Sequence, residues 1–339
     1  MNEFLKSILD GIYMLVGNYG WAIILFTLLI KLIILPFDVK SRKSMRKTQL
    51  IQPELNRLNK KYQNDKDKLN RKTMELYKKH GISPMSSCLP MLLTMPVLFA
   101  MFAAMRMIAD EEVAKQLFTF LQGGTPEFQG WFWIKNIWMP DSPFNSMVPN
   151  ANTFTTITAD VWQRIYNGLG EAQSLLPALV DAAGNAIAYD FSTAESTKAV
   201  VAAMTQHMVA LPQYQQYMNI VPGLGNLNFI IGSVSIYANW NGLLILPVLA
   251  AATQLLMTKL TPTPAPADPN QANAGNGAFM KWFFPIFSLV ICFQYNAAFA
   301  LYWVASNVIA SAQTWLVNKY LDAKEAKEKT VTVGEGSIK

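Results

Sequence analysis

The sequence predicts an all-α polytopic membrane protein with five transmembrane helices and a cytoplasmic helical hairpin. Of its 339 residues, 52% are hydrophobic and only 15% are charged, whereas soluble domains carry about 25% charged residues. The last apolar stretch, 279–317, is about 39 residues long, whereas one crossing needs roughly 20. We therefore divide it into two spans at a tight turn near residues 294–298. The predicted spans are 20–37, 84–107, 241–258, 279–295 and 297–317.

Residues 1–19 precede the first span and are expected to form an amphipathic helix in the outer membrane interface. They show no basic start followed by a small-residue cleavage site, so they do not predict a signal peptide. The alternative is that they simply extend the first span. Apolar residues recur at helical spacing, at Phe4, Leu5, Ile8, Leu9, Ile12 and Val16, opposite Glu3, Lys6, Ser7 and Asp10.

The distribution of charge predicts which loops are cytoplasmic. Segment 38–83 holds 14 of the 28 Lys and Arg residues and five acids, a net charge of +9, whereas segment 108–240 has a net charge of −6. Because short cytoplasmic loops carry the excess of positive charge, 38–83 is predicted inside and 108–240 outside. The N-terminus is then outside, and the lysine-rich tail 318–339 is in the cytoplasm.

The basic segment 38–83 reads as a helical hairpin, with helices over 41–62 and 66–80 around the polar turn "QNDKD". Pro53 is expected to restart or bend the first arm, and Gly81 to end the second. The next helix is expected to start at Ser83-Pro84. The positive charge suits anionic lipid head groups or an acidic partner such as the ribosome, and both stay open.

Two further loops differ in composition. Residues 259–278 are rich in Pro, Ala, Asn and Gly and predict a flexible cytoplasmic loop. Within the outer segment, about 140–235 is long enough for a small extracytoplasmic domain, with helices expected near 159–175 and 195–209.

The sequence does not predict an enzyme. Its two histidines, His80 and His207, fall in different compartments, and its two cysteines, Cys88 and Cys292, lie in or beside spans. Neither a phosphate-binding GxxxxGK[ST] loop nor an HExxH zinc motif is present. No catalytic residue, metal, cofactor or sequence-specific nucleic-acid partner is therefore expected.

Polar residues inside the spans are the candidates for function. Thr27 and Lys31 are four residues apart and share a helix face. Lys31 lies six residues, about 9 Å, from the cytoplasmic end of its span at Phe37, so its amine either reaches the head groups or lines a wet site. A charge in mid-membrane costs about 2.5–3.5 kcal/mol on insertion scales, which favours a functional role. Polar residues of the other spans, which interhelical hydrogen bonding also explains, are Ser86, Ser87, Cys88, Thr94, Ser306, Asn307 and Gln313.

Four stretches together resemble the YidC/Oxa/Alb family of membrane protein insertases. They cover all five predicted spans and the basic hairpin in the same order, without a large domain between the first two spans, which is similar to the Gram-positive type. The stretches are "GNYGWAIILFTLLIKLIILP" (17–36), "YKKHGISPMSSCLPMLLTMPVLFAMF" (77–102), "WFWIKNIWMPD" (131–141) and "LYWVASNVIASAQTWLV" (301–317).

The resemblance implies five helices around a hydrophilic groove that opens to the cytoplasm and to lipid and is sealed on the outer face. The family's positive charge on the first span falls on Lys31, where arginine is usual. Lysine keeps the charge but loses bidentate binding of carboxylates. A second departure is "NAAFALYW" (296–303), where relatives carry Pro-Ala-Gly-Leu, and a third is the long outer segment. The expected substrate groove consists of Thr27, Lys31, Thr94, Tyr302, Trp303, Ser306 and Asn307.

The function that the resemblance implies is insertion of nascent membrane proteins into a bacterial cell membrane. The groove would take the polar tail of the client, and burial of its apolar span in lipid would drive the step without ATP. Implied partners are nascent membrane proteins, the ribosome and anionic lipids, with the Sec translocon as a further candidate. The alternatives are a small-solute channel or transporter in which Lys31 attracts an anion, and a passive assembly scaffold.

Overall fold

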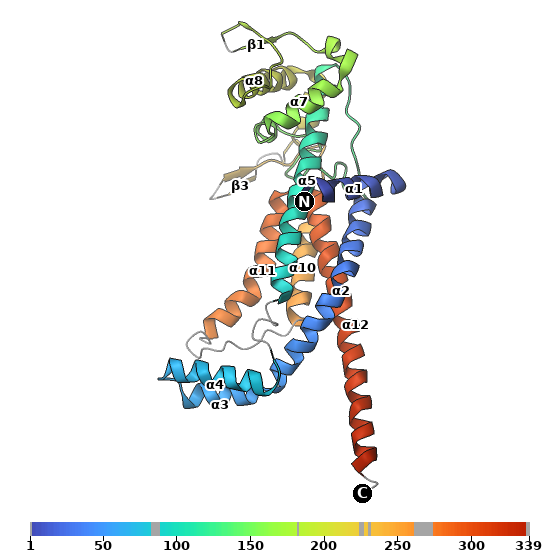
Figure 1. The fold of residues 1–339 in the computed structure, drawn as a ribbon. Coiled ribbons are helices and arrows are strands. Elements are labelled where there is room, and N and C mark those ends of the chain that lie inside the picture. The colour runs from blue at the N-terminus through green and yellow to red at the C-terminus, as the bar shows by residue number, and fades with distance from the viewer. Residues whose placement is uncertain are drawn as a thin grey trace. The chain divides into compact units, whose positions relative to one another are not determined.

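The computed structural model describes residues 2–82, 89–181, 183–223, 227–229, 232–260 and 274–336, and these are mostly helical (Figure 1). The predicted helix start at Ser83-Pro84 and most of the predicted loop 259–278 lie outside the described residues. The chain forms two compact units, and each is described by itself. The first unit comprises 1–24, 100–248 and 290–302; the second comprises 25–99, 249–289 and 303–339.

The first unit consists of short helices and two small antiparallel hairpins around the end of a long helix, α5 (Leu89–Leu121). Its other helices are α1 (Asn2–Val16), the start of α2 (Tyr19–Leu50), α6 (Ala151–Phe154), α7 (Ala159–Gly168), the 3-10 helix Gly170–Leu175, α8 (Ala194–Ala210) and α9 (Pro212–Met218). Strand β1 (Leu179–Val180) pairs with β2 (Ala186–Ile187), and β3 (Leu227–Phe229) pairs with β4 (Gly232–Val234).

Helix α5 continues well past residue 107, where its predicted span ends. Phe118 and Phe120, in its last turns, are fully buried. Phe118 packs edge-on against Trp162 of α7, with ring centroids 5.8 Å apart, and Phe120 packs edge-on against Tyr214 of α9 at 5.7 Å. Burial of these large rings stabilises the extension, so one helix joins the predicted second span to the core of the region 140–235.

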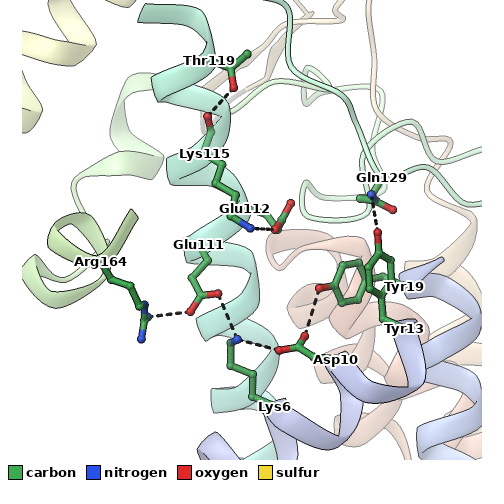
Figure 2. Close-up of polar contacts among 10 residues, drawn as sticks. All are labelled: Lys6, Asp10, Tyr13, Tyr19, Glu111, Glu112, Lys115, Thr119, Gln129 and Arg164. Carbon is green, nitrogen blue, oxygen red and sulfur yellow. Dashed lines mark hydrogen bonds and ion pairs between the residues drawn. The ribbon is translucent and has the colours of Figure 1, made fainter. Parts of the chain in front are cut away.

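Helix α1 is held to α5 by ion pairs, and Figure 2 shows the network. Glu111 of α5 lies between two cations: Lys6 of α1 at 3.3 Å and Arg164 of α7 at 2.8 Å. Lys6 also pairs with Asp10 at 2.9 Å, and Asp10 accepts a hydrogen bond from Tyr19. One carboxylate therefore links the N-terminal helix to the inserted region.

These contacts show which side of the helix expected over residues 1–19 packs against the first unit, while its place in the membrane interface stays a prediction. Leu5 and Leu9 of the predicted apolar face are buried in the protein, and the polar residues Lys6 and Asp10 also point into it toward their partners. Phe4 and Leu15 remain exposed. The apolar surface left for an interface is thus narrower than the sequence pattern indicates.

The stability of the first unit is expected to depend on the protonation of Asp110, next to Glu111. Burial raises the pKa of this carboxyl to about 6, although Arg106, 3.6 Å away, acts in the opposite direction. Its pKa in an unfolded chain is about 3.9, so between these values the folded state binds the proton more tightly. The contribution of Asp110 to the free energy of unfolding should therefore rise as pH falls from 7 to 4, by up to about 3 kcal/mol.

The measurement is unfolding of the detergent-solubilised chain at pH 7 and at pH 5, compared with Asp110→Asn. The variant lacks this titration, so the parent should gain stability relative to the variant on going from pH 7 to pH 5. An equal change in both proteins would assign the pH dependence to other groups.

Within the first unit, the segment 131–141 contacts the first residues of two helices, α10 (Ile245–Leu260) and α12 (Ala297–Gly336). Asp141 is fully buried, and its carboxylate accepts hydrogen bonds from the backbone N–H groups of Leu243 and Leu246, both at 2.7 Å, at the start of α10. The carbonyl groups of Ile137 and Met139 accept from the first N–H groups of α12. The segment therefore satisfies donors that the starts of both helices leave free.

Two buried asparagines hold this segment in place. Asn241 donates its amide to the carbonyl groups of Asn136, Met139 and Pro140 and accepts from the N–H of Asn136 at 2.7 Å. Asn136 in turn donates to the side chain of Gln116 on α5. Buried amides with all these partners fix a single backbone conformation.

The turn before α12 is short despite the departure from the family pattern. Only two residues, Tyr295 and Asn296, separate helix α11 (Ala274–Gln294) from α12. Asn296 accepts a hydrogen bond from the N–H of Phe299 at 2.9 Å through its side chain, which is N-capping. Asparagine therefore starts the helix where relatives are expected to use proline.

The second unit contains the main part of α2 together with α3 (Gln52–Lys61) and α4 (Lys66–Lys79). α2 runs unbroken through Pro36 to Leu50, which corrects the predicted hairpin arm 41–62. A proline inside a helix removes one backbone hydrogen bond, and the good helix formers that follow it extend the helix. The hairpin itself is therefore α3 and α4, which lie side by side (Figure 1).

The hairpin of α3 and α4 has a small apolar core of its own. Ile51, Leu55, Leu76 and Ile82 are buried together, with Leu58 and Tyr77 packed against them. Asp65 of the "QNDKD" turn caps α4 by accepting from the N–H of Lys68 at 3.0 Å. Gly81 adopts a φ of +60°, which suits glycine after a helix end.

Within the described residues, α2 alone is both long enough and apolar enough to cross a bilayer by those two criteria. Ile245–Leu260 and Lys281–Gln294 are apolar but shorter. The helical fold class is confirmed, while the number of five spans stays a prediction.

Candidate functional site

One face of α2 carries a row of polar side chains in the second unit. Lys31, Asp38, Arg42 and Gln49 are spaced by seven, four and seven residues, so they recur on the same side of the helix. Among the described residues, Asp38 and Arg42 are near enough to Lys31 to influence it electrostatically. Arg42 itself pairs with Asp38 at 2.9 Å. The row extends the polar position of Lys31 toward the end of α2 that carries the hairpin.

Lys31 is half-buried, and no carboxylate among the described residues lies within ion-pair distance of its amine. Arg42 and Arg46 of the same helix, by contrast, both have such partners. An unpaired ammonium group in apolar surroundings is unfavourable. Because no carboxylate among the described residues pairs with it directly, the ammonium group can attract an anionic group from outside the protein.

A pocket lies farther along the same face, between α2 and α12. Arg46 forms an ion pair with Asp322 at 2.7 Å and donates to the carbonyl of Asn318 at 3.0 Å. The pocket beside this pair has a volume of about 390 Å³ and is also lined by Arg42 and Gln49. Each of the two arginines has an acidic neighbour, so the pocket itself is close to neutral.

Helix α12 is joined to its neighbours by polar side chains. Gln313 donates to the backbone carbonyl of Lys31 at 3.1 Å, which fixes α12 against α2. Asn307 donates to Gln254 of α10 at 3.1 Å and to Thr253 at 3.4 Å. Asn307 therefore makes the interhelical hydrogen bonds that the sequence offered as one explanation for it.

The other expected groove residues have different surroundings. Thr27 is only 1% exposed, so it does not face open space in this conformation. Trp303 and Ser306 are half-buried, and the ring of Trp303 lies 6.4 Å from that of Phe287 of α11. Tyr302 belongs to the first unit, where it is buried. Thr94 lies in α5, and its side chain falls outside the described residues.

The structure adds three residues to those expected from the sequence, Arg42, Arg46 and Asp322, and it gives a partner to Gln313, which the sequence already singled out. Arg42 is eleven residues from Lys31, close to three helical turns, so helical periodicity alone could have placed it on the same face. The pairing of Arg46 with Asp322 has no local signal, because the two residues are far apart in the sequence.

The comparisons with known proteins agree with one another. The model of one protein family, described as the 60Kd inner membrane protein, matches residues 11–325. A relative from Fusobacterium nucleatum, named membrane protein insertase YidC, is 46% identical over 106 residues, which are 31% of this chain and 52% of the relative. Two more relatives carry that name. The relative from Clostridium perfringens is 38% identical over 40% of this chain and 51% of its own length. The relative from Janthinobacterium is 25% identical over 91% of this chain and 35% of its own length. The chain thus spans about a third to a half of the length of these relatives.

Proposed function

The chain belongs to the 60Kd inner membrane protein family, and on this premise we propose that it is an insertase and chaperone for nascent membrane proteins. The relatives that match it are named membrane protein insertases. That name favours an insertase over the small-solute channel. The matched region, residues 11–325, includes the groove residues and the basic hairpin, but not the end of the lysine-rich tail.

The observation that carries the proposal is Lys31 on the polar face of α2, whose amine has no carboxylate within ion-pair distance among the residues that the structure describes. Its ammonium group attracts the polar, often acidic, tail of a client, and water around the polar face shortens the apolar distance that the tail crosses. The client's own span then leaves the groove sideways into lipid. Burial of about 20 apolar residues drives that step, so ATP is not required.

The remaining groove residues are proposed to contact the client's span. Trp303 and Tyr302 offer aromatic surface, Thr27, Thr94 and Ser306 offer hydroxyl groups, and Asn307 reaches the client when its bonds to α10 exchange. Since Thr27 and Tyr302 are both buried in this conformation, the helices around each of them move apart when a client enters.

The membrane arrangement is part of the same proposal. The chain would cross a bacterial cell membrane five times, at 20–37, 84–107, 241–258, 279–295 and 297–317, with its N-terminus outside and its C-terminus in the cytoplasm. The net charge of +9 on 38–83 supports this orientation. α2 is the described helix whose length and apolarity support it.

The partners proposed from charge are the ribosome and anionic lipids, with the Sec translocon as a further candidate. The hairpin of α3 and α4 exposes most of its lysines and arginines around a thin apolar core. The C-terminal part of α12 continues as a helix into the lysine-rich tail. Both segments suit the phosphates of ribosomal RNA or of lipids without reading a base sequence.

Site-specific photocrosslinking tests the proposal. Photoreactive side chains at Thr27, Thr94 and Trp303 are expected to react with a stalled ribosome–nascent chain that carries one apolar span. The matched control is Ile33, which is exposed on α2 two residues, and so about half a turn, from Lys31. Crosslinks should disappear when the client's span is made polar. Equal crosslinking from Ile33 and Thr27, or none from any position, would contradict the groove.

A further inference from the structure

The turn at Trp131–Ile134 combines backbone strain with an exposed aromatic ring. Trp131 and Ile134 exchange two backbone hydrogen bonds of 2.9 Å, so only Phe132 and Trp133 form the loop between them. Phe132 has a φ of +48° and is 73% exposed. For a bulky side chain this left-handed conformation is unfavourable. The fold therefore maintains an unfavourable conformation that directs a phenyl ring outward.

This turn is fixed to the first turn of α2. Asn18, just before the helix, donates its amide to the carbonyl of Gly130 at 2.9 Å. The backbone of Gly20 lies so close to the ring of Trp131 that a Cβ atom there would overlap it. The ring of Trp21 lies 5.9 Å from that of Trp131 and 5.8 Å from that of Phe132, both edge-on. The turn and the start of α2 therefore keep one position along the helix axis.

The place of attachment identifies the surroundings of the exposed ring. α2 is the described helix able to cross a bilayer, and its apolar run begins at Trp21. A turn packed against Trp21 must stand where that run enters the membrane. Tryptophan and other aromatic side chains gather at this level because their rings suit the boundary between head groups and acyl chains. In water an exposed phenyl ring has no comparable partner.

We propose that the turn 131–134 is a membrane-interface anchor, in which Phe132 inserts between lipids at the end of α2 where the span begins. The partner is a lipid surface, on the outer leaflet in the orientation given above. Insertion of the ring offsets the strain at Phe132, and the contacts with Asn18, Gly20 and Trp21 transmit the anchoring to α2.

Anchoring at this level sets the depth of Lys31, a consequence that rests on the proposed function. Lys31 follows Trp21 by ten residues, about 15 Å along the helix. The hydrocarbon core is about 30 Å thick, so the ammonium group comes to lie near its middle. The anchor thus keeps the Lys31 ammonium group near the middle of the hydrocarbon core, where a polar tail is most costly to bury.

The first experiment measures the depth of residue 132 directly. Phe132→Cys is made in a full-length chain that also carries Cys88→Ser and Cys292→Ala, and is labelled with a nitroxide. The labelled chain is placed in vesicles of phosphatidylethanolamine and phosphatidylglycerol. Collision of the label with oxygen should exceed collision with a water-soluble nickel complex. Asn185→Cys, an exposed position in the turn between β1 and β2, is the control and should show the reverse.

Equal nickel access at the two positions would overturn the anchor, whatever the chain does as an insertase. A second set of variants excludes an effect of folding. Asparagine tolerates positive φ, so Phe132→Asn should unfold in detergent at the same or a higher temperature than the parent. It should nevertheless insert a charged-tail client several-fold more slowly, while Phe132→Trp should retain the rate. A loss of thermal stability in Phe132→Asn that matches its loss of insertion would assign Phe132 to packing instead.

Discussion

Replacing Asp141 with alanine is expected to lower the free energy of unfolding by about 3–5 kcal/mol, a large part of the stability of a typical domain. The carboxylate is fully buried and accepts three hydrogen bonds: from the N–H groups of Leu243 and Leu246 and from the indole of Trp133 at 3.2 Å. Alanine would leave all three donors without an acceptor. Each unsatisfied buried donor costs about 1–3 kcal/mol.

The effect should be larger than that of an ordinary helix cap, because Asp141 connects separate parts of the chain. It lies more than 100 residues before α10 in the sequence, and its own segment also binds the start of α12. The start of α10 and the start of α12 would both lose order in the variant. Gly242→Ala tests the same junction by another route, since a Cβ atom at Gly242 would collide with the Asp141 carboxylate.

The measurement is reversible unfolding in mixed detergent micelles, followed by circular dichroism. Asp181→Ala is the matched control: Asp181 also accepts several hydrogen bonds, but from an exposed turn of its own. That variant should lose much less stability than Asp141→Ala. Asp141→Asn keeps one acceptor oxygen and should fall between the parent and the alanine variant. If Asp141→Ala and Asp181→Ala lost the same stability, the bracing role of 131–141 would be wrong.

The helical character of the chain was predictable because each signal is local. Apolar runs, Gly81 after α4 and the acidic cap at Asp65 act within a few residues of the helix they define. The ends of the long helices were less predictable. The length of an apolar run reflects the thickness of the hydrocarbon core, whereas a helix continues as long as its backbone hydrogen bonds are made. The helices α2 and α5 therefore continue past Pro36 and past residue 107, beyond the ends of the predicted spans.

The candidate site was predictable in part for the same reason. A lysine in an apolar run of 17 residues is conspicuous without any knowledge of the fold, because charge is rare inside spans. Its neighbours are not conspicuous. The hydrogen bond from Gln313 to the carbonyl of Lys31 joins residues 282 positions apart, and helical periodicity says nothing about which helix a polar face meets. The strain at Phe132 was equally hidden, since no residue type signals it.

Reversing the charge at position 31 is expected to have the largest effect on function. Lys31→Glu should slow insertion of a client with an acidic tail by about tenfold or more. Two unit charges 4 Å apart interact with about 4 kcal/mol at an effective dielectric constant of 20, and about 1.4 kcal/mol corresponds to a factor of ten. Lys31→Arg should retain the rate, because the charge is kept and a bidentate donor is gained.

Lys40→Glu is the matched control for this charge reversal. Lys40 is exposed on the same helix, and nine residues are two and a half turns, so it lies on the face opposite Lys31. The net charge of the chain changes equally in the two variants. A difference between them therefore reports the position of the charge and not its contribution to the overall field.

Exchanging the charge of the client separates attraction from folding. If Lys31 acts on the tail by electrostatics, Lys31→Glu should insert a client with a basic tail faster than the parent does, and a variant that had merely unfolded could not gain activity. The rate is measured as protection of the tail from protease in proteoliposomes, with both clients and all three variants. If Lys31→Glu slowed both clients alike, the residue would act through packing. If it slowed neither, its amine would reach the head groups, and the polar face of α2 would serve the client without a charge.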